Sequence, residues 1–190
     1  AYKTMGTPMM VKIVNQAGAF PTRYWSEGSC EHWEKISADA LHERCQVKPH
    51  ACLKCFMACG RMTTISKGRH QGLKLEGPEY ETIGIFGSSC YINDLEVISK
   101  LGFICNEMGM DTISAGYVIS WAMECYEKGL LTDEQLDGLA LEWGDGEAAL
   151  VLSDALAVRS PRSAYVWALR AGAAGAEGAD SCSKVSWPWG

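Results

Sequence analysis

Apolar residues recur every three or four positions through much of the second half of the chain, which is the spacing of an amphipathic α-helix. Asn93 or Asp94 can cap the first of these helices, and Gly109 is expected to end it. A second helix is expected from about Thr112, with Gly129 as its C-terminal signal. The apolar face of the first helix comprises Leu95, Ile98, Leu101, Ile104 and Met108. This pattern favours a mainly helical fold.

Capping signals predict two further helices. Thr132 and Gln135 have the spacing of a capping box. Asp145 lies in a turn between two glycines and can cap a helix that runs through Val158. The segment 171–179 is nearly all Ala and Gly and lacks this periodicity. We therefore expect the end of the chain to be weakly ordered.

The first half of the chain carries fewer helical signals. Residues 36–45 are predicted to form a short helix that ends before the extended pair Lys48–Pro49. The stretch 66–79 is polar and contains glycines, and it is expected to be irregular. The predicted fold class is therefore mainly α, an irregular helical domain with a cysteine-cluster loop.

The composition excludes several classes of protein. With 190 residues, 47% of them hydrophobic and 21% charged, the chain can bury a sizeable core, and disorder of its bulk is excluded. The longest charge-free stretches, 82–93 and 112–123, are shorter than the ~20 residues of a membrane span. A formal net charge of −6 argues against a nucleic-acid partner. We expect a globular protein that binds neither nucleic acid nor membrane.

The nine cysteines are an unusual number. An odd count, in a chain without a secretory signal pattern, favours a reducing, cytoplasmic location over a secreted disulfide scaffold. Three of them are spaced C-x2-C-x3-C, at Cys52, Cys55 and Cys59. The cysteines in apolar settings, which are predicted to be core residues, are Cys90, Cys105 and Cys125.

The spacing of the triplet favours a metal site. Zinc usually takes two separated pairs of ligands, and a thioredoxin-like redox pair needs a βαβ context; the sequence has neither a second C-x2-C nor that context. Three closely spaced thiolates can bind one [4Fe–4S] cluster, with a fourth ligand from elsewhere, for which Cys182 is a candidate. Lys54 and Arg61 would add positive charge that offsets the charge of the cluster. Structural zinc and buried structural cysteines stay open as alternatives.

Seven motifs occur in a fixed order along the chain. They are NQAGAFPTR (15–23), CLKCFMAC (52–59), GPEYETI (77–83), ND (93–94), CN (105–106), DTISAG (111–116) and WGDGE (143–147). Each motif is modest by itself, but the ordered set is specific. Over roughly residues 6 to 150 the chain resembles the central, helical part of the tungsten-dependent aldehyde ferredoxin oxidoreductase family.

The resemblance implies a set of cofactors and a reaction. Members of that family hold tungsten, or molybdenum, between two pyranopterin dithiolenes, beside one [4Fe–4S] cluster. They oxidise an aldehyde to a carboxylate and pass two electrons through the cluster to ferredoxin. Ferredoxin, or another low-potential electron carrier, is therefore the implied partner, and an aldehyde is the implied substrate.

The resemblance also implies roles for individual residues. The implied cluster ligands are Cys52, Cys55 and Cys59. Asp111 matches the aspartate that hydrogen-bonds a pterin, and Ala115 matches a position whose backbone contacts it. Glu81 matches an acidic residue close to the metal, where it could handle a proton. From the residues alone, a helix cap is the favoured role of Asp111, and Glu81 fits either a partly buried or an ordinary surface position.

The chain also departs from the family pattern. The family's separate β-rich N-terminal domain, which binds the pterins, has no counterpart, and the D-x-x-G-L-C motif with the fourth cluster cysteine is absent. We therefore expect residues 1–150 to be a helical iron–sulfur and pterin-contacting domain, and 151–190 a degenerate or incomplete C-terminal segment. Such a chain would need further domains for catalysis. The alternative is a helical metal-binding module, for iron–sulfur electron transfer or structural zinc, without catalysis.

Overall fold

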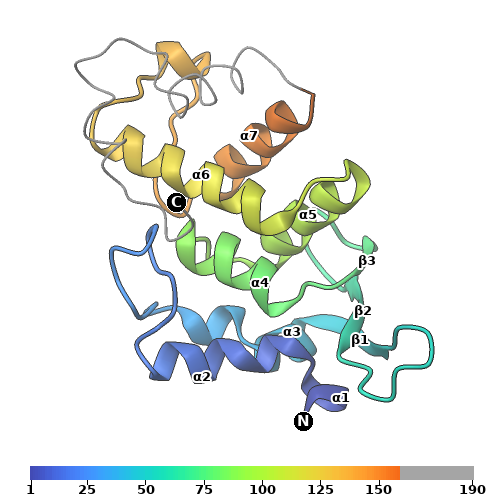
Figure 1. Ribbon diagram of the computed structural model, residues 1–190. Helices are drawn as coiled ribbons and strands as arrows, with labels where there is room; N and C mark the ends of the chain where they lie inside the picture. The colour runs from blue at the N-terminus through green and yellow to red at the C-terminus, as the bar shows by residue number, and fades with distance from the viewer. Residues whose placement is uncertain (159–190) are drawn as a thin grey trace.

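The computed structural model describes residues 1–158, in which a small sheet lies at one side of a group of helices (Figure 1). The α-helices are α1 (Tyr2–Met5), α2 (Met10–Gln16), α3 (Ala38–Arg44), α4 (Tyr80–Thr82), α5 (Leu95–Glu107), α6 (Thr112–Glu127) and α7 (Gly146–Val158). The strands are β1 (Cys45–His50), β2 (Gly60–Ile65) and β3 (Lys74–Glu76). Short 3₁₀ turns span Thr7–Met9, Trp33–Ile36 and Glu134–Leu136, and a π-helical segment spans Ile83–Ser89. The predicted mainly α fold is confirmed; segment 171–179 and Cys182 lie outside the described residues.

The two long central helices begin and end where the sequence predicts. The Asp94 carboxylate caps α5 by accepting a hydrogen bond from the backbone N–H of Glu96 at 2.9 Å. Gly109, just beyond the end of α5, has a φ of +66°, a left-handed conformation that glycine adopts without strain. Gly129 follows α6 with a φ of +67° for the same reason. These three predictions are confirmed.

The third and fourth predicted helices differ in outcome. The capping box forms, because the backbone N–H of Thr132 donates to the side chain of Gln135 at 2.9 Å. Only a 3₁₀ turn follows it, since Asp137 adopts a left-handed φ of +55° that ends the turn at once. The prediction of a full helix there is wrong. The fourth helix, α7, begins as predicted, with the Asp145 carboxylate accepting from the N–H of Ala148 at 2.9 Å, and it runs to Val158.

The segment between α3 and α4 contains an antiparallel sheet, in the order β1-β2-β3. Strand β1 includes the pair Lys48–Pro49 that is predicted to be extended, and β3 lies within the stretch 66–79 that is expected to be irregular. In β2, Arg61, Thr63 and Ile65 are buried, while the alternate residue Met62 is exposed. This is the two-residue period of a half-buried strand. The alternation was hidden in the sequence because two of the inward-facing residues, arginine and threonine, are polar. The expected helix at 36–45 is real but shorter, since Cys45 already belongs to β1.

The π-helical segment lies between the N-terminal helices and the later pair α5 and α6 (Figure 1). All seven of its residues are buried. A Cβ at Gly116 of α6 would lie 2.4 Å from a side-chain carbon of Ile85, so glycine is what lets α6 approach this segment. A Cβ at Gly87 would lie 2.8 Å from the end of the Ile36 side chain. The packing thus fixes the segment that follows α4.

The core confirms the predicted positions of three cysteines. Cys90, Cys105 and Cys125 are each at most 1% exposed and belong to the main hydrophobic cluster. Small, weakly polar thiols pack in such cores as hydrophobic groups. None of the helices in residues 1–158 combines the length and the apolarity that crossing a membrane requires.

Candidate functional site

The three clustered cysteines lie on the loop of residues 51–59, called here the cysteine loop, which joins β1 to β2 and projects from the side of the molecule (Figure 1). Cys52 and Cys55 are exposed, and Cys59 is half-buried. The backbone N–H of Cys55 donates to the carbonyl of Cys52 at 2.9 Å, which turns the loop between them. Lys54 and Ala58 hold left-handed backbone angles, with φ of +61° and +50°. The loop is therefore bent twice within the triplet.

The loop carries the thiols without gathering them around one point. Within residues 1–158 the structure holds no group of three or more metal-binding side chains arranged around a common centre. None of the eight cysteines in this part of the chain takes part in a disulfide. Two apolar side chains of the loop are almost fully exposed, Leu53 at 92% and Phe56 at 91%.

The other cysteines have a different chemistry. Burial raises the pKa of Cys30 and of Cys105 to about 11, and it raises the pKa of Cys45 and Cys90 as well. These groups stay protonated at neutral pH, and a thiol, unlike a thiolate, is a poor metal ligand. In the cysteine loop, by contrast, Cys52 and Cys55 are exposed and Cys59 is only half-buried. This donor set fits a soft metal or an iron–sulfur cluster.

A pocket of about 720 Å³ lies between the sheet and the beginnings of α4 and α6, and α5 borders it. Glu81 and Asp111, which the sequence analysis singled out separately, both line it. The acidic residues around it are Glu76, Glu79, Glu81, Glu107 and Asp111. Lys74 and Asn106 add a positive charge and an amide to the lining. The pocket therefore suits a ligand that offers N–H or O–H donors.

Glu81 is exposed, so of the two positions that the sequence left open the surface one is correct. It occupies the first turn of α4, and the buried run begins only at the next residue, Thr82. Its carboxylate is accessible from the pocket.

The segment that carries Glu81 is held in place by residues that the sequence analysis did not identify. The Thr7 hydroxyl donates to the Glu79 carboxylate and accepts from the backbone N–H of Tyr80 at 2.9 Å. The Thr63 hydroxyl donates to the Gly77 carbonyl at 2.5 Å. No local pattern could reveal these partners, because Thr7 lies more than seventy positions from the segment it holds.

Asp111 caps α6, as one of its two predicted roles requires. One carboxylate oxygen accepts from the backbone N–H of Ser114 at 2.7 Å. A carboxylate offers about four lone-pair sites, so capping leaves acceptor capacity that faces the pocket. Ala115 is buried in the same helix, and its N–H donates to the Asp111 carbonyl at 3.0 Å. A contact of Ala115 with a bound group would therefore be one of packing rather than N–H donation.

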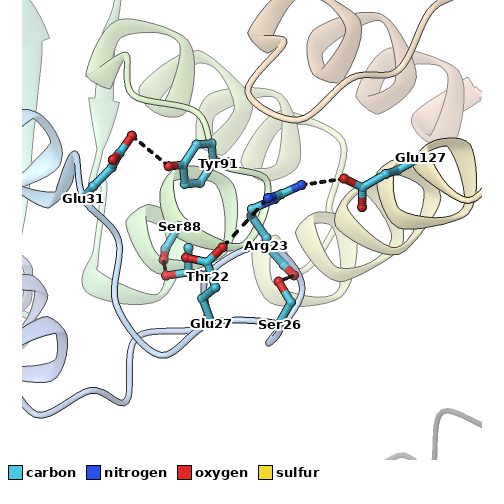
Figure 2. Close-up of polar contacts among 8 residues, drawn as sticks. All are labelled: Thr22, Arg23, Ser26, Glu27, Glu31, Ser88, Tyr91 and Glu127. Carbon is cyan, nitrogen blue, oxygen red and sulfur yellow. Dashed lines mark hydrogen bonds and ion pairs between the residues drawn. The ribbon is translucent and has the colours of Figure 1, made fainter.

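Two of the ordered motifs meet at Arg23, whose side chain contacts Trp143; its ion pair with Glu127 is drawn in Figure 2. The Arg23 guanidinium pairs with Glu127 of α6 at 2.5 Å, and its central carbon lies 5.4 Å from the ring centre of Trp143. Figure 2 also shows the Thr22 and Ser88 hydroxyls, 2.8 Å apart, joining this turn to the π-helical segment. Motif residues 15–23 and 143–147 are thus brought together by the fold, and sequence reasoning had assigned them no common location.

Residues 1–167 match the family described as "Aldehyde ferredoxin oxidoreductase, domains 2 & 3". A tungsten-containing aldehyde ferredoxin oxidoreductase of Thermococcus kodakarensis is 38% identical over 155 residues, which are 81% of this chain and 25% of that protein. The protein of the same description from Pyrococcus furiosus is 35% identical over 143 residues, 75% of this chain and 23% of its own length. The chain therefore spans about a quarter of the length of these relatives.

More distant proteins share the fold or part of the sequence. The chain is 32% identical over 129 residues to an aliphatic sulfonate oxidoreductase, WOR-like subunit, of Pyrococcus furiosus, covering 67% of the chain and 20% of that subunit. A solved structure, the active site complex BamBC of benzoyl coenzyme A reductase with 1,5-dienoyl-CoA, superposes with a TM-score of 0.66 at 19% identity. That match covers 94% of this chain and 27% of the other, and it shows the fold alone. By the extent of the family match and the identity of its relatives, the chain belongs to the aldehyde ferredoxin oxidoreductase family, within domains 2 and 3.

Proposed function

We propose that this chain provides the iron–sulfur and pterin-contacting part of an oxidoreductase that converts aldehydes to carboxylates and passes the electrons to ferredoxin. The observation that carries the proposal is the shared pocket of Glu81 and Asp111, two carboxylates from separate family motifs. Because the chain spans about a quarter of its relatives, the proposal includes a further, pterin-binding domain that covers the pocket.

Cys52, Cys55 and Cys59 are the proposed ligands of a [4Fe–4S] cluster. The exposure of Cys52 and Cys55 and the partial exposure of Cys59 support this assignment, because such thiols are available to a cluster while the buried core cysteines are not. The loop must close to bring the three sulfurs together, since it does not hold them around one centre. A fourth ligand must come from outside the described residues.

A tungsten, or molybdenum, bis-pyranopterin would supply oxygen transfer and accept the electron pair of the aldehyde when bound. Asp111 is proposed to orient the pterin. The lone pairs of its carboxylate that do not cap α6 would accept hydrogen bonds from N–H groups of the pterin. Ala115 is proposed to lie against the same group. Neither role disturbs the cap of α6.

Glu81 is proposed to take up a proton that the oxidation releases. The conversion of an aldehyde and water to a carboxylate liberates protons as well as electrons, so a base beside the reacting carbon is needed. The Glu81 carboxylate is exposed toward the pocket, and the hydrogen bonds of Thr7 fix the neighbouring residues Glu79 and Tyr80. Those bonds hold the backbone at the start of the short helix α4, which carries Glu81.

The test is anaerobic purification of the full chain, followed by analysis of iron, acid-labile sulfide, zinc, tungsten and molybdenum, with EPR of the reduced sample. The proposal predicts about three to four irons per chain, matching sulfide and the EPR signal of a reduced cluster. Tungsten or molybdenum in addition would show that the chain recruits the pterin cofactor. Zinc without sulfide would contradict the proposal and favour a structural metal-binding module.

A further inference from the structure

A fully buried arginine lies directly behind the cysteine loop. Arg61, in β2, is 0% exposed. A guanidinium in such a position needs hydrogen-bond acceptors for its donors. The main-chain carbonyls that accept from it belong to Tyr2, Lys3, Thr4, Ala58 and Cys59.

These carbonyls come from two segments that are far apart in the sequence. On one side Nη2 donates to the Ala58 carbonyl at 2.6 Å, and Nε donates to the Cys59 carbonyl at 3.3 Å. On the other side the guanidinium donates to Tyr2 at 3.0 Å and to Thr4 at 3.1 Å. The Cys59 end of the cysteine loop is therefore fastened to the C-terminal turn of α1.

The acceptors suit a cation. Carbonyls at the C-terminal end of a helix carry partial negative charge and attract positive groups. Burial lowers the pKa of Arg61, while the charge of the nearby Glu79 raises it. A guanidinium stays protonated in proteins, so this contact keeps its charge.

A glycine of the N-terminal segment makes the contact possible. Gly6 has a φ of +68°, and a Cβ there would lie 2.6 Å from Nε of Arg61 and 2.9 Å from the carbonyl oxygen of Cys59. The segment therefore comes close to the arginine and to the loop at one point, and only glycine fits there.

The main chain of Arg61 extends the connection to the pocket. Its carbonyl accepts from the backbone N–H of Gly77 at 2.6 Å, at the beginning of the segment that carries Glu79 and Glu81. Thr7, the neighbour of Gly6, holds the same segment through the Glu79 carboxylate. One buried residue thus joins the cysteine loop, the N-terminal segment and the pocket wall.

We propose that Arg61 is a positioning residue, which holds the Cys59 end of the cysteine loop in a fixed place while the rest of the loop closes on a metal, and which ties that end to the Glu81 segment. The role in metal binding rests on the proposed function above. The positioning itself does not, because it rests on hydrogen bonds from the Arg61 side chain to main-chain carbonyls of this chain.

The first test needs no metal. The full chain is reduced and alkylated under native conditions, and the rate at each cysteine is followed by mass spectrometry of its peptides. Arg61→Lys keeps the charge but cannot reproduce the fork of donors, so Cys59 should react about tenfold faster. Cys52 and Cys55, already exposed, should keep their rates and serve as controls within the same molecule.

Two further variants make the test decisive. Arg69→Lys alters an arginine whose side chain is 70% exposed and pairs with Glu147, so all three rates should stay unchanged. Gly6→Ala retains the arginine but adds a methyl group that would clash with its side chain. This variant should raise the alkylation rate of Cys59 alone. Alkylation of the buried Cys30 would show that Arg61→Lys does not fold. In that case the Cys59 rate in Gly6→Ala is the test of the proposal. An unchanged Cys59 rate in a folded variant overturns the proposal.

The second test uses the chain reconstituted anaerobically with ferrous iron and sulfide. Transfer of iron to a chelator should be about tenfold faster from Arg61→Lys than from the parent chain or Arg69→Lys. Equal release rates would overturn the role in metal binding. If the parent chain takes up no iron, the proposed function fails, while the alkylation result still decides the positioning role.

Discussion

Glu81 and Asp111 line one pocket although they lie on different helices, α4 and α6, and each occupies the beginning of its helix. The π-helical segment and α5 lie between them in the sequence, and their packing brings the two ends together. Gly116, which lets α6 approach Ile85, therefore helps to place the two carboxylates. The site depends on how the helices pack as well as on the motif residues.

Glu81→Gln should lower kcat of the metal-loaded oxidoreductase by about a hundredfold, because the amide cannot accept the proton. The free energy of unfolding should change by less than about 0.5 kcal/mol, since Glu81 is exposed. Glu76→Gln, also exposed and in the pocket lining, is the matched control and should keep its activity. Equal loss in both variants would mean that the pocket needs negative charge in general and no base at position 81.

Asp111 has two roles that two substitutions separate. Asp111→Ala removes the helix cap and should cost about 1 kcal/mol of unfolding free energy in urea. Asp111→Asn keeps a capping side chain and should cost much less, while it weakens retention of the pterin metal. The same pair at Asp94, the cap of α5, should change stability alike and leave the tungsten or molybdenum content unaltered. Full metal retention in Asp111→Asn would contradict the pterin role.

Gly116→Ala should destabilise the chain by about 1–3 kcal/mol, because its Cβ would lie 2.4 Å from the Ile85 side chain. Gly84→Ala is the control. A Cβ there meets Phe20 at 3.5 Å, an ordinary contact, so its unfolding free energy should change by less than about 1 kcal/mol. Thermal unfolding followed by circular dichroism measures both. Similar melting temperatures for the two variants would refute the close approach of α6.

The buried thiols predict a loss of stability at alkaline pH. The pKa of Cys30 and of Cys105 is raised by burial from 9.0 to about 11 in the folded chain. Above pH 9 the unfolded chain therefore loses protons that the folded chain keeps, so stability is full below pH 9 and falls as pH rises toward 11. Each thiol contributes on the order of 2 kcal/mol to this fall. Urea unfolding under reducing conditions should show it, and Cys30→Ala should make the dependence shallower.

The sequence predicts the helices of the second half well because their caps are local. Asp94 and Asp145 each bond an N–H within three residues, so the signal and the structure share one short segment. Strand β2 escaped prediction because Arg61 and Thr63 face inward, where a pattern of hydrophobic residues would be expected. These buried polar side chains form hydrogen bonds with main-chain partners from other segments, such as the Tyr2 carbonyl of α1, which accepts from Arg61.

The candidate site likewise has some features that the sequence predicts and others that it does not. Its chemical groups could be identified from short motifs, since Cys52, Glu81 and Asp111 each lie in one. The hydrogen bond of Thr7 to Glu79 and the burial of Arg61 could not, because both depend on contacts between segments more than fifty positions apart. Long-range packing supplies those partners, and no local spacing encodes it.

Whether the cysteine loop binds an iron–sulfur cluster is decided by comparing Cys55→Ala with Cys45→Ala. Both cysteines belong to the β1–β2 hairpin, but Cys55 lies on the exposed loop and Cys45 is buried at the start of β1. After anaerobic reconstitution, iron, sulfide and the EPR signal of the reduced cluster are measured for both and for the parent chain. If the loop holds the cluster, Cys55→Ala loses most of its iron and the EPR signal while Cys45→Ala retains them. Equal iron and an unchanged signal in Cys55→Ala would contradict binding of the cluster by the loop.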